Sequence, residues 1–278
     1  MRVPREIALA ERILDENAIC NNCLGRQFPK FKPQLSNKER GLLLRFLAIT
    51  KTKSWKSEGY TWKELLDLLG KQSCDLCNGI FEKIDYVAFQ LIEKLSNYEF
   101  DSFLCGARVP FEMAEKEDIF RAKYKVKGES LRKEIIREVG LRLNKLLKKQ
   151  TSFADPDIKI TFEPYKNDLN IEIVPKPLFC LAEVGDRTTN EIKKELEDFF
   201  LEEYQAESVK IKELRESDSS AKGGSLLVKI IHPKKRRILD DQLVSEKMGT
   251  IRLREVSKNF HKMKKIPRMD GTFKGKDF

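Results

Sequence analysis

The sequence contains few histidines and no long hydrophobic run. Its two histidines, His232 and His261, have no partners at ligand spacing, which favours ordinary core or surface roles over metal binding. No apolar run reaches the roughly 18 residues that a transmembrane helix needs, which excludes a bilayer-spanning segment. The N-terminal stretch MRVPREIALAERIL lacks the apolar core and cleavage site of a signal peptide. We therefore expect a cytoplasmic protein with no membrane partner, in which thiols stay reduced.

Acidic side chains are outnumbered by basic ones. Lys and Arg total 54 against 44 Asp and Glu, which gives a formal net charge of +10. This excess favours a polyanionic partner, with nucleic acid first among the candidates. A surface of Lys and Glu that is merely solvated remains the alternative. With 278 residues, of which 40% are hydrophobic, the chain can fill the cores of two ordinary domains.

Four of the six cysteines form two close pairs, CNNC at 20–23 and CDLC at 74–77. Two residues between cysteines let both sulfurs face one ion, and two such pairs satisfy the tetrahedral preference of zinc. The sequence therefore predicts a closed, structural zinc site formed by Cys20, Cys23, Cys74 and Cys77. Such a site can contribute on the order of 10 kcal/mol to folding.

Other roles for the cysteines are weaker. A redox CxxC motif usually stands alone at a helix start in a βαβ setting, which neither pair has. The separation between the two pairs exceeds the usual zinc-ribbon spacing of about 15–20 residues, but helices between them can bring the pairs together. Cys105 and Cys180 lie inside apolar, strand-like segments, where a free cysteine is usually a buried core residue.

The first third of the chain has helical periodicity. Apolar residues at helical spacing predict helices at 5–19, 36–50, 61–69 and 82–96. In the third of these, Thr61 and Glu64 stand at the positions of a capping box.

After Asn97 the pattern changes to a mixture of strands and helices. The segment before Pro110 is typical of a short buried strand. Helices are expected at 113–123, 128–149 and 188–204. Alternating residues predict strands at 158–163, 169–175, 179–184, 209–214, 225–231 and 250–256. The fold class is thus α+β.

These patterns predict four parts. Residues 1–98 form a helical zinc-binding module, 99–185 an α/β domain, 186–256 a small α+β extension, and 257–278 a basic tail that is too polar and Gly-containing to fold.

Specific motifs resemble a known family. CNNCLGRQF at 20–28, FLCGARVPFEMAEKEDIFRAKYKVKGESLRKEIIREVG at 103–140, DPDIKITFE at 155–163 and PLF at 177–179 are similar to the N-terminal accessory region of archaeal and eukaryotic tRNA pseudouridine synthases that act on the T-arm. That region joins a four-cysteine zinc module to a THUMP domain. The resemblance implies that residues 99–185 are THUMP-like, that the four cysteines hold zinc, and that the partner is tRNA, held at its acceptor end.

The resemblance stops before the family's catalytic domain. About a hundred residues follow PLF, and the Gly-Arg-Glu-Asp-type motif that carries the catalytic aspartate in the family is absent. RILDD at 237–241 faintly matches another synthase motif, but Asp240 is more simply a surface charge beside a basic run. A base-modifying enzyme must enclose a flipped nucleotide in a pocket, and few residues follow Asp240 to build one. We assign no catalytic residue and expect a stand-alone module or one subunit of a split enzyme.

Candidate RNA contacts follow from charge and location. The resemblance places Arg108, Arg121, Lys133 and Arg137 in the RNA-holding region, and Lys148 continues the same basic helix. Four consecutive cations after a strand and a proline, Lys234, Lys235, Arg236 and Arg237, form a second patch.

Three functions remain open from the sequence. The first is a non-catalytic tRNA-binding protein that serves a partner catalytic subunit. The second is a divergent tRNA pseudouridine synthase acting on T-arm uridine. The third is a protein-interaction module that uses a strand edge within 208–231.

Overall fold

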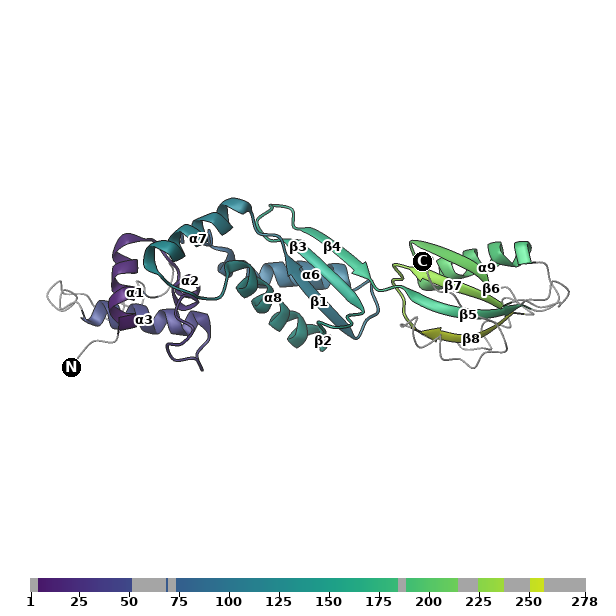
Figure 1. The fold of residues 1–278 in the computed structure, drawn as a ribbon, viewed down its shortest axis with the longest axis horizontal. Coiled ribbons are helices and arrows are strands. Elements are labelled where there is room, and N and C mark those ends of the chain that lie inside the picture. Colours follow the sequence, from purple (N-terminus) through teal and green to yellow (C-terminus); the bar gives the residue numbers. More distant parts are fainter. Residues whose placement is uncertain are drawn as a thin grey trace. The chain divides into compact units, whose positions relative to one another are not determined.

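The computed structural model describes residues 5–51, 69, 74–184, 189–214, 225–237 and 251–257. These residues form helices and two four-stranded β-sheets, so the predicted α+β class is confirmed (Figure 1). Within these ranges no helix is both long enough and apolar enough to cross a membrane.

The chain divides into two compact units. The first comprises Met1–Glu93, Cys105–Lys148 and Thr161–Glu172, and the second comprises Lys94–Leu104, Lys149–Ile160 and Ile173–Phe278. The domain limits expected at 98, 185 and 256 remain predictions. The predicted helix at 61–69, apart from Leu69, and the predicted tail beyond residue 257 lie outside the described residues.

Three helices open the chain: α1 (Arg5–Glu16), α2 (Asn21–Gly25) and α3 (Asn37–Lys51). Periodicity predicted α1 and α3, whereas the five-residue α2 is too short to show a period. Helix α3 begins with a capping box, in which Ser36 Oγ accepts from the Glu39 amide at 3.2 Å and the Glu39 carboxylate accepts from the Ser36 amide at 2.8 Å.

Helices α2 and α3 touch through their backbones. A Cβ atom added at Gly25 would lie 1.8 Å from the Asn37 carbonyl oxygen, and one added at Gly41 would lie 1.8 Å from the Asn21 carbonyl oxygen. Only glycine fits at these two positions. The two close contacts therefore fix the position of α2 along the axis of α3.

The middle of the chain forms the first sheet. One α-helix precedes its first strand, and two more connect that strand to the next. Its elements are η1 (Ile80–Glu82), α6 (Ile84–Leu95), β1 (Ser102–Ala107), α7 (Phe111–Tyr124), α8 (Leu131–Leu147), β2 (Gln150–Thr151), β3 (Ile158–Glu163) and β4 (Asn170–Pro175). The strand order is β2-β1-β3-β4. Alternate residues of β1 and β3 are buried. The period-two pattern predicted β3, whereas β1 was predicted from the apolar segment before Pro110. Strand β2 was missed because two exposed polar residues carry no pattern.

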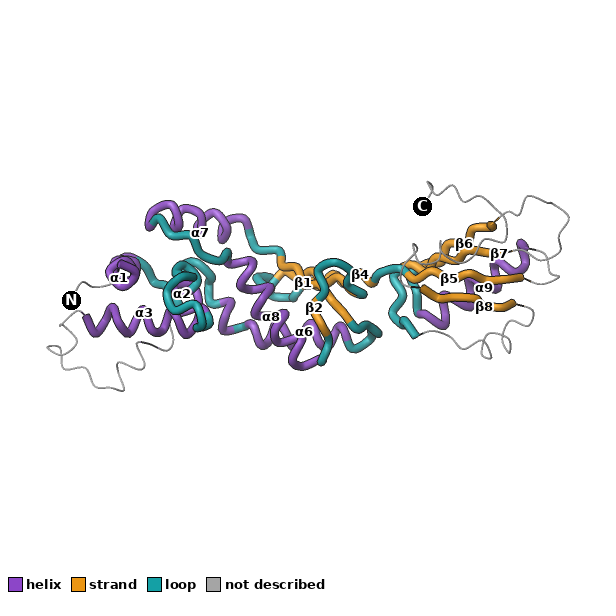
Figure 2. The backbone as a smooth tube through the Cα atoms, turned by 60° about the horizontal axis from the view of Figure 1, so that its bottom comes forward, coloured by secondary structure: helices purple, strands orange, loops and turns teal. Residues whose placement is uncertain are grey.

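The second sheet contains β5 (Leu178–Val184), β6 (Ser208–Leu214), β7 (Ser225–Ile231) and β8 (Ile251–Ser257), in the order β6-β7-β5-β8. Its pairs are antiparallel. Helix α9 (Thr189–Tyr204) covers one face of this sheet (Figure 2). Strand β5 lies within the range 99–185 expected for the α/β domain, but it pairs with β7 and β8, because alternation specifies a strand and not its neighbours.

Candidate metal centre and its charged surroundings

The two cysteine pairs meet. The Sγ atoms of Cys20, Cys23, Cys74 and Cys77 all lie within 4.8 Å of one another, and all but Cys20 are buried. Cys20 is the N-cap of α2, and its sulfur accepts from the Cys23 amide at 3.4 Å. The second pair is anchored to the first by the Asp75 amide, which donates to the Ala18 carbonyl at 2.9 Å.

The donor set fits a tetrahedral metal ion. A Zn–S bond of about 2.3 Å implies sulfur atoms about 3.8 Å apart at the corners of a tetrahedron. The Cys20 and Cys77 sulfurs lie 3.6 Å apart, close to this value. Four sulfur ligands leave no open coordination position, so a metal bound here would have a structural role and not a catalytic one. The cluster is therefore compatible with zinc.

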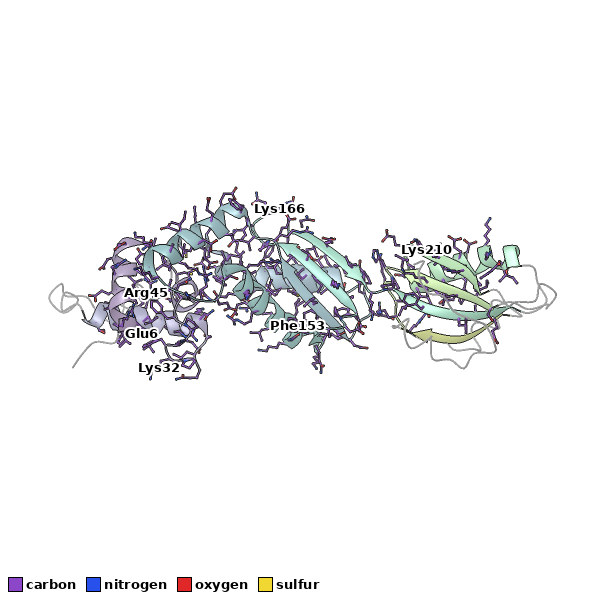
Figure 3. All side chains as sticks on the ribbon, viewed as in Figure 1. Glu6, Lys32, Arg45, Phe153, Lys166 and Lys210 are labelled. Atoms are coloured by element: carbon purple, nitrogen blue, oxygen red, sulfur yellow. The ribbon has the colours of Figure 1, made fainter. Side chains whose placement is uncertain are left out.

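Two arginines offset the negative charge of the thiolates. A dication with four thiolates carries a net charge of −2, which is costly to bury without compensation. Arg26 is fully buried and its Nη1 donates to Cys23 Sγ at 2.7 Å. Arg45 of α3, labelled in Figure 3, is also buried and its Nε donates to Asn21 Oδ1 at 2.9 Å, beside the first cysteine pair. Arg26 thus interacts with a candidate ligand directly, and Arg45 interacts electrostatically with Cys20 and Cys74.

Arg26 also connects the metal centre to α7 and α8. Its Nε lies 3.0 Å from Glu117 of α7, and its Nη1 lies 3.5 Å from Glu134 of α8. Glu117 in turn accepts from the Leu131 amide at 3.0 Å, which caps the first turn of α8. Gly128 fits against the same segment, since a Cβ atom there would lie 1.9 Å from the Arg26 carbonyl oxygen. The segment after Cys23 is therefore held by charge and by backbone contact.

The pKa values in this cluster reflect burial and charge. Burial raises the pKa of the Cys23 thiol well above its usual value. Hydrogen bonds within the cluster, with Cys20 as the strongest partner, lower the pKa of Cys74 and raise that of Cys77. Burial raises the pKa of Glu134 to about 7, although Arg26 and Asn22 act in the opposite direction. Four thiolates this close repel one another, so their full ionisation requires a cation between them.

The two remaining cysteines are buried, as expected for core residues. Burial raises the pKa of Cys105 and that of Cys180 to about 12, so both stay protonated.

The basic residues of the first unit that are predicted to contact RNA differ in their exposure and in their ion pairs. Arg108 is exposed but pairs with Glu172 at 2.7 Å and Glu163 at 3.4 Å. Arg121 donates to the Glu129 carbonyl at 2.6 Å and pairs with Glu117, and Arg137 pairs with Glu129 and Glu138. Lys133 and Lys148, at the two ends of α8, have exposed side chains. Their role in RNA binding remains a prediction.

The four residues of the predicted patch at 234–237 differ in their exposure to solvent. Glu99 accepts from the amides of Arg236 and Arg237, at 2.7 and 3.1 Å, which fixes this loop. Arg236 is then buried and lies 3.8 Å from Asp157. Lys234 and Arg237 are exposed, and Lys235 is partly buried. Only part of this patch faces solvent.

Sequence reasoning missed the buried charges around the cysteines. Arg26, Glu117 and Glu134 were not singled out, although Arg26 follows Cys23 by three residues and lies within the CNNCLGRQF motif. That spacing on a short helix would have placed its side chain near the ligands. Glu117 and Glu134 gave no local signal, since acidic residues on a helix are usually exposed.

The comparisons with known proteins define the class of the central region. Residues 87–163 match the family model described as the Pus10 THUMP domain, archaeal. The chain is 32% identical to the tRNA pseudouridine synthase Pus10 of Pyrococcus furiosus over 60% of this chain and 40% of that protein. It is 36% identical to the enzyme of the same name from Picrophilus torridus over 56% of this chain and 38% of that protein.

A longer alignment is found with the tRNA pseudouridine synthase Pus10 of Vulcanisaeta distributa, at 24% identity over 84% of this chain and 65% of that protein. The resemblance to this enzyme family is confirmed, and residues 87–163 are similar to its THUMP domain. The chain spans about 40% of the length of the first two relatives. No solved structure gives a significant match.

Proposed function

We propose that this chain is a tRNA-binding THUMP-type protein of tRNA modification that acts as an accessory or stand-alone RNA-binding module. The observation that carries the proposal is the match of residues 87–163 to the Pus10 THUMP domain. The net charge of +10 supports it, because Lys and Arg gain affinity for RNA by releasing counterions from phosphates.

We further propose that the metal is zinc and that its role is structural. The support is the closed set of four sulfurs and the two arginines that offset its charge. Elemental analysis of freshly purified protein should find about one zinc per chain, and the Cys74→Ser variant should lose it. A tetrahedral four-sulfur site can also hold iron, so iron in place of zinc would contradict this part of the proposal.

For RNA contact we propose the exposed members of the basic set: Arg108, Lys133, Lys148, Lys234 and Arg237. Arg121, Arg137 and Arg236 are engaged in hydrogen bonds and ion pairs that hold their surroundings in place. Their replacement would therefore affect folding as well as binding, so they are poor first choices for a test.

The experiment is filter binding with a tRNA transcript, with and without its CCA end, across a salt series. We expect binding that weakens steeply with salt, a preference for the complete acceptor end, and a smaller salt slope in the Lys133→Ala/Lys148→Ala variant. Lys210→Ala, an exposed lysine of β6 labelled in Figure 3, serves as the matched control. Absence of binding to either transcript, or binding that salt leaves unchanged, would contradict the proposal.

The second candidate function is catalysis, alone or with a partner subunit. The observation that favours it is the alignment with the Vulcanisaeta distributa relative, which extends over 84% of this chain and so beyond the THUMP region. The chain would then be a divergent synthase acting on T-arm uridine. Incubation with unmodified tRNA followed by pseudouridine mapping tests this, and Asp240→Asn tests whether RILDD contributes.

A further inference from the structure

A hollow of about 280 Å³ lies beside the metal centre in the first unit. It is bounded by the turn after Cys77, by the start of α6, and by the loop 164–169 between β3 and β4. Ile80 and Val87, both 2% exposed, the buried Pro164 and the partly buried Leu169 form its apolar part. The volume is slightly below the range for small-molecule sites, about 300–1,000 Å³, which suits one nucleotide better than a large cofactor.

The walls of the hollow are fixed by local structure. Asn78 and Gly79 have positive φ angles of 46° and 71°, which turn the chain sharply after Cys77. Tyr165 in the opposite loop donates its hydroxyl hydrogen to the Cys77 carbonyl at 3.1 Å. The loop between β3 and β4 is thereby attached to the segment that carries the last metal ligand, so metal binding and the shape of the hollow are connected.

The rim carries the chemistry that recognises an unpaired nucleotide. Tyr86 lines the hollow with 58% of its surface exposed, and Lys83 stands one helical turn before it. Lys166, labelled in Figure 3, lies on the opposite loop, where Glu163 accepts one of its hydrogen bonds at 2.6 Å. The exposed amides of Asn78 and Asn167 complete the lining. An aromatic face binds a base by stacking, cations attract phosphate, and amides read base edges.

We propose that this hollow holds one unpaired nucleotide of the bound RNA, with its base on the Tyr86 ring and a phosphate near Lys83 and Lys166. The proposal rests on the function proposed above, because it assumes that RNA is the ligand. It goes further by assigning a specific site, outside the basic positions selected from the sequence, to a base that is free to leave the stack. An acidic peptide would use the two lysines, but it would leave the exposed aromatic face without a matching group.

The test uses the full chain with two probes. The first is the tRNA transcript, and the second is a short single-stranded RNA that contains 2-aminopurine, whose fluorescence falls when the base stacks. The variants are Tyr86→Ala, Tyr86→Phe and Lys83→Ala. Phe89→Ala is the matched control, because Phe89 is 67% exposed on the same helix but does not line the hollow. All three positions are on the surface, and circular dichroism checks that each variant is folded.

We expect Tyr86→Ala to weaken tRNA binding about tenfold and to abolish quenching, since it removes the aromatic ring on which the base stacks. Tyr86→Phe and Phe89→Ala should bind like the original protein. Lys83→Ala should weaken binding and reduce the salt slope by about one.

Two results would overturn the site. In the first, Tyr86→Ala and Lys83→Ala bind tRNA and quench the fluorescent RNA as strongly as the original protein does. The second is a polyglutamate peptide that displaces the labelled RNA as effectively as unlabelled RNA does, which would assign the hollow to acidic peptides. A third result would separate the two proposals. If the protein does not bind tRNA but still quenches the short RNA in a Tyr86-dependent way, the proposed tRNA function is wrong and the nucleotide site is supported.

Discussion

The metal centre and the second sheet are stabilised in different ways. Around the cysteines the buried side chains include Arg26, Arg45, Glu117 and Glu134, together with the sulfurs themselves. The core between α9 and the second sheet is formed by apolar and aromatic side chains, and none of the charged side chains described in α9, β5, β6 and β7 is buried. The first core depends on charges that must be matched, whereas the second depends on the apolar area removed from water.

The comparison predicts that the first core responds to metal, pH and ion pairing, while the second responds to side-chain volume alone. The same chain thus contains an internal control for each experiment.

The largest effect should come from metal removal. A strong chelator, or Cys74→Ser, should cost on the order of 10 kcal/mol and unfold α1, α2 and α3. Hydrogen exchange should then accelerate in these helices but stay slow in β5 and β7. Cys105→Ala is the control, because Cys105 is a buried cysteine outside the metal cluster. Unchanged exchange in α2 and α3 after complete removal of the metal would contradict this prediction.

Single buried side chains should rank next. Arg26→Met removes the fully buried cation that Glu117 and Glu134 share, and removal of one partner from a buried ion pair costs about 3–5 kcal/mol. Phe200→Ala should cost a similar amount, about 3–5 kcal/mol, through a cavity in the apolar core.

The two variants should differ in their metal dependence. Denaturant unfolding with and without zinc measures this dependence. Arg26→Met should lower the affinity for zinc, and Phe200→Ala should leave that affinity unchanged. Equal zinc affinity in both variants would show that Arg26 acts only through packing.

A third effect concerns pH. The pKa of Glu134 is about 7 in the folded protein and about 4.3 in an unfolded chain. Between these values the folded state holds a proton that the unfolded state releases, so the stabilisation present at low pH is lost as the pH rises through 7. For zinc-saturated protein, stability relative to Glu134→Gln should fall by up to about 3 kcal/mol from pH 4.5 to above 7. Parallel pH curves for the two proteins would contradict this.

The smallest effect should be stabilising. Gly140 lies within α8, and a Cβ atom added there meets nothing within 4 Å. Gly140→Ala should therefore raise the free energy of unfolding by up to about 1 kcal/mol through helix propensity. Gly41→Ala is the opposite case, because its Cβ atom would overlap the Asn21 carbonyl, and a thermal melt should show a lower Tm. A rise in Tm for both would mean that the contact between α2 and α3 is not tight.

Local features of the sequence indicated most of the described elements and the four cysteines that could hold a metal ion. The spacing of Cys20 and Cys23, and of Cys74 and Cys77, sufficed because two residues between cysteines fix the direction of both sulfurs. The apolar periods of α8 and α9 sufficed because a helix repeats its buried face every turn.

The tertiary structure decided which segments became neighbours and which charges were buried. Alternation made β5 a strand, but only the packing of the whole chain paired it with β7 and β8. Arg236 and Arg237 are adjacent and identical in type, yet the first is buried against Asp157 and the Lys176 carbonyl, whereas the second pairs with Glu203 and stays exposed. The physical reason is that burial and pairing are set by residues far away in sequence, while periodicity and ligand spacing are set by the chain's local geometry.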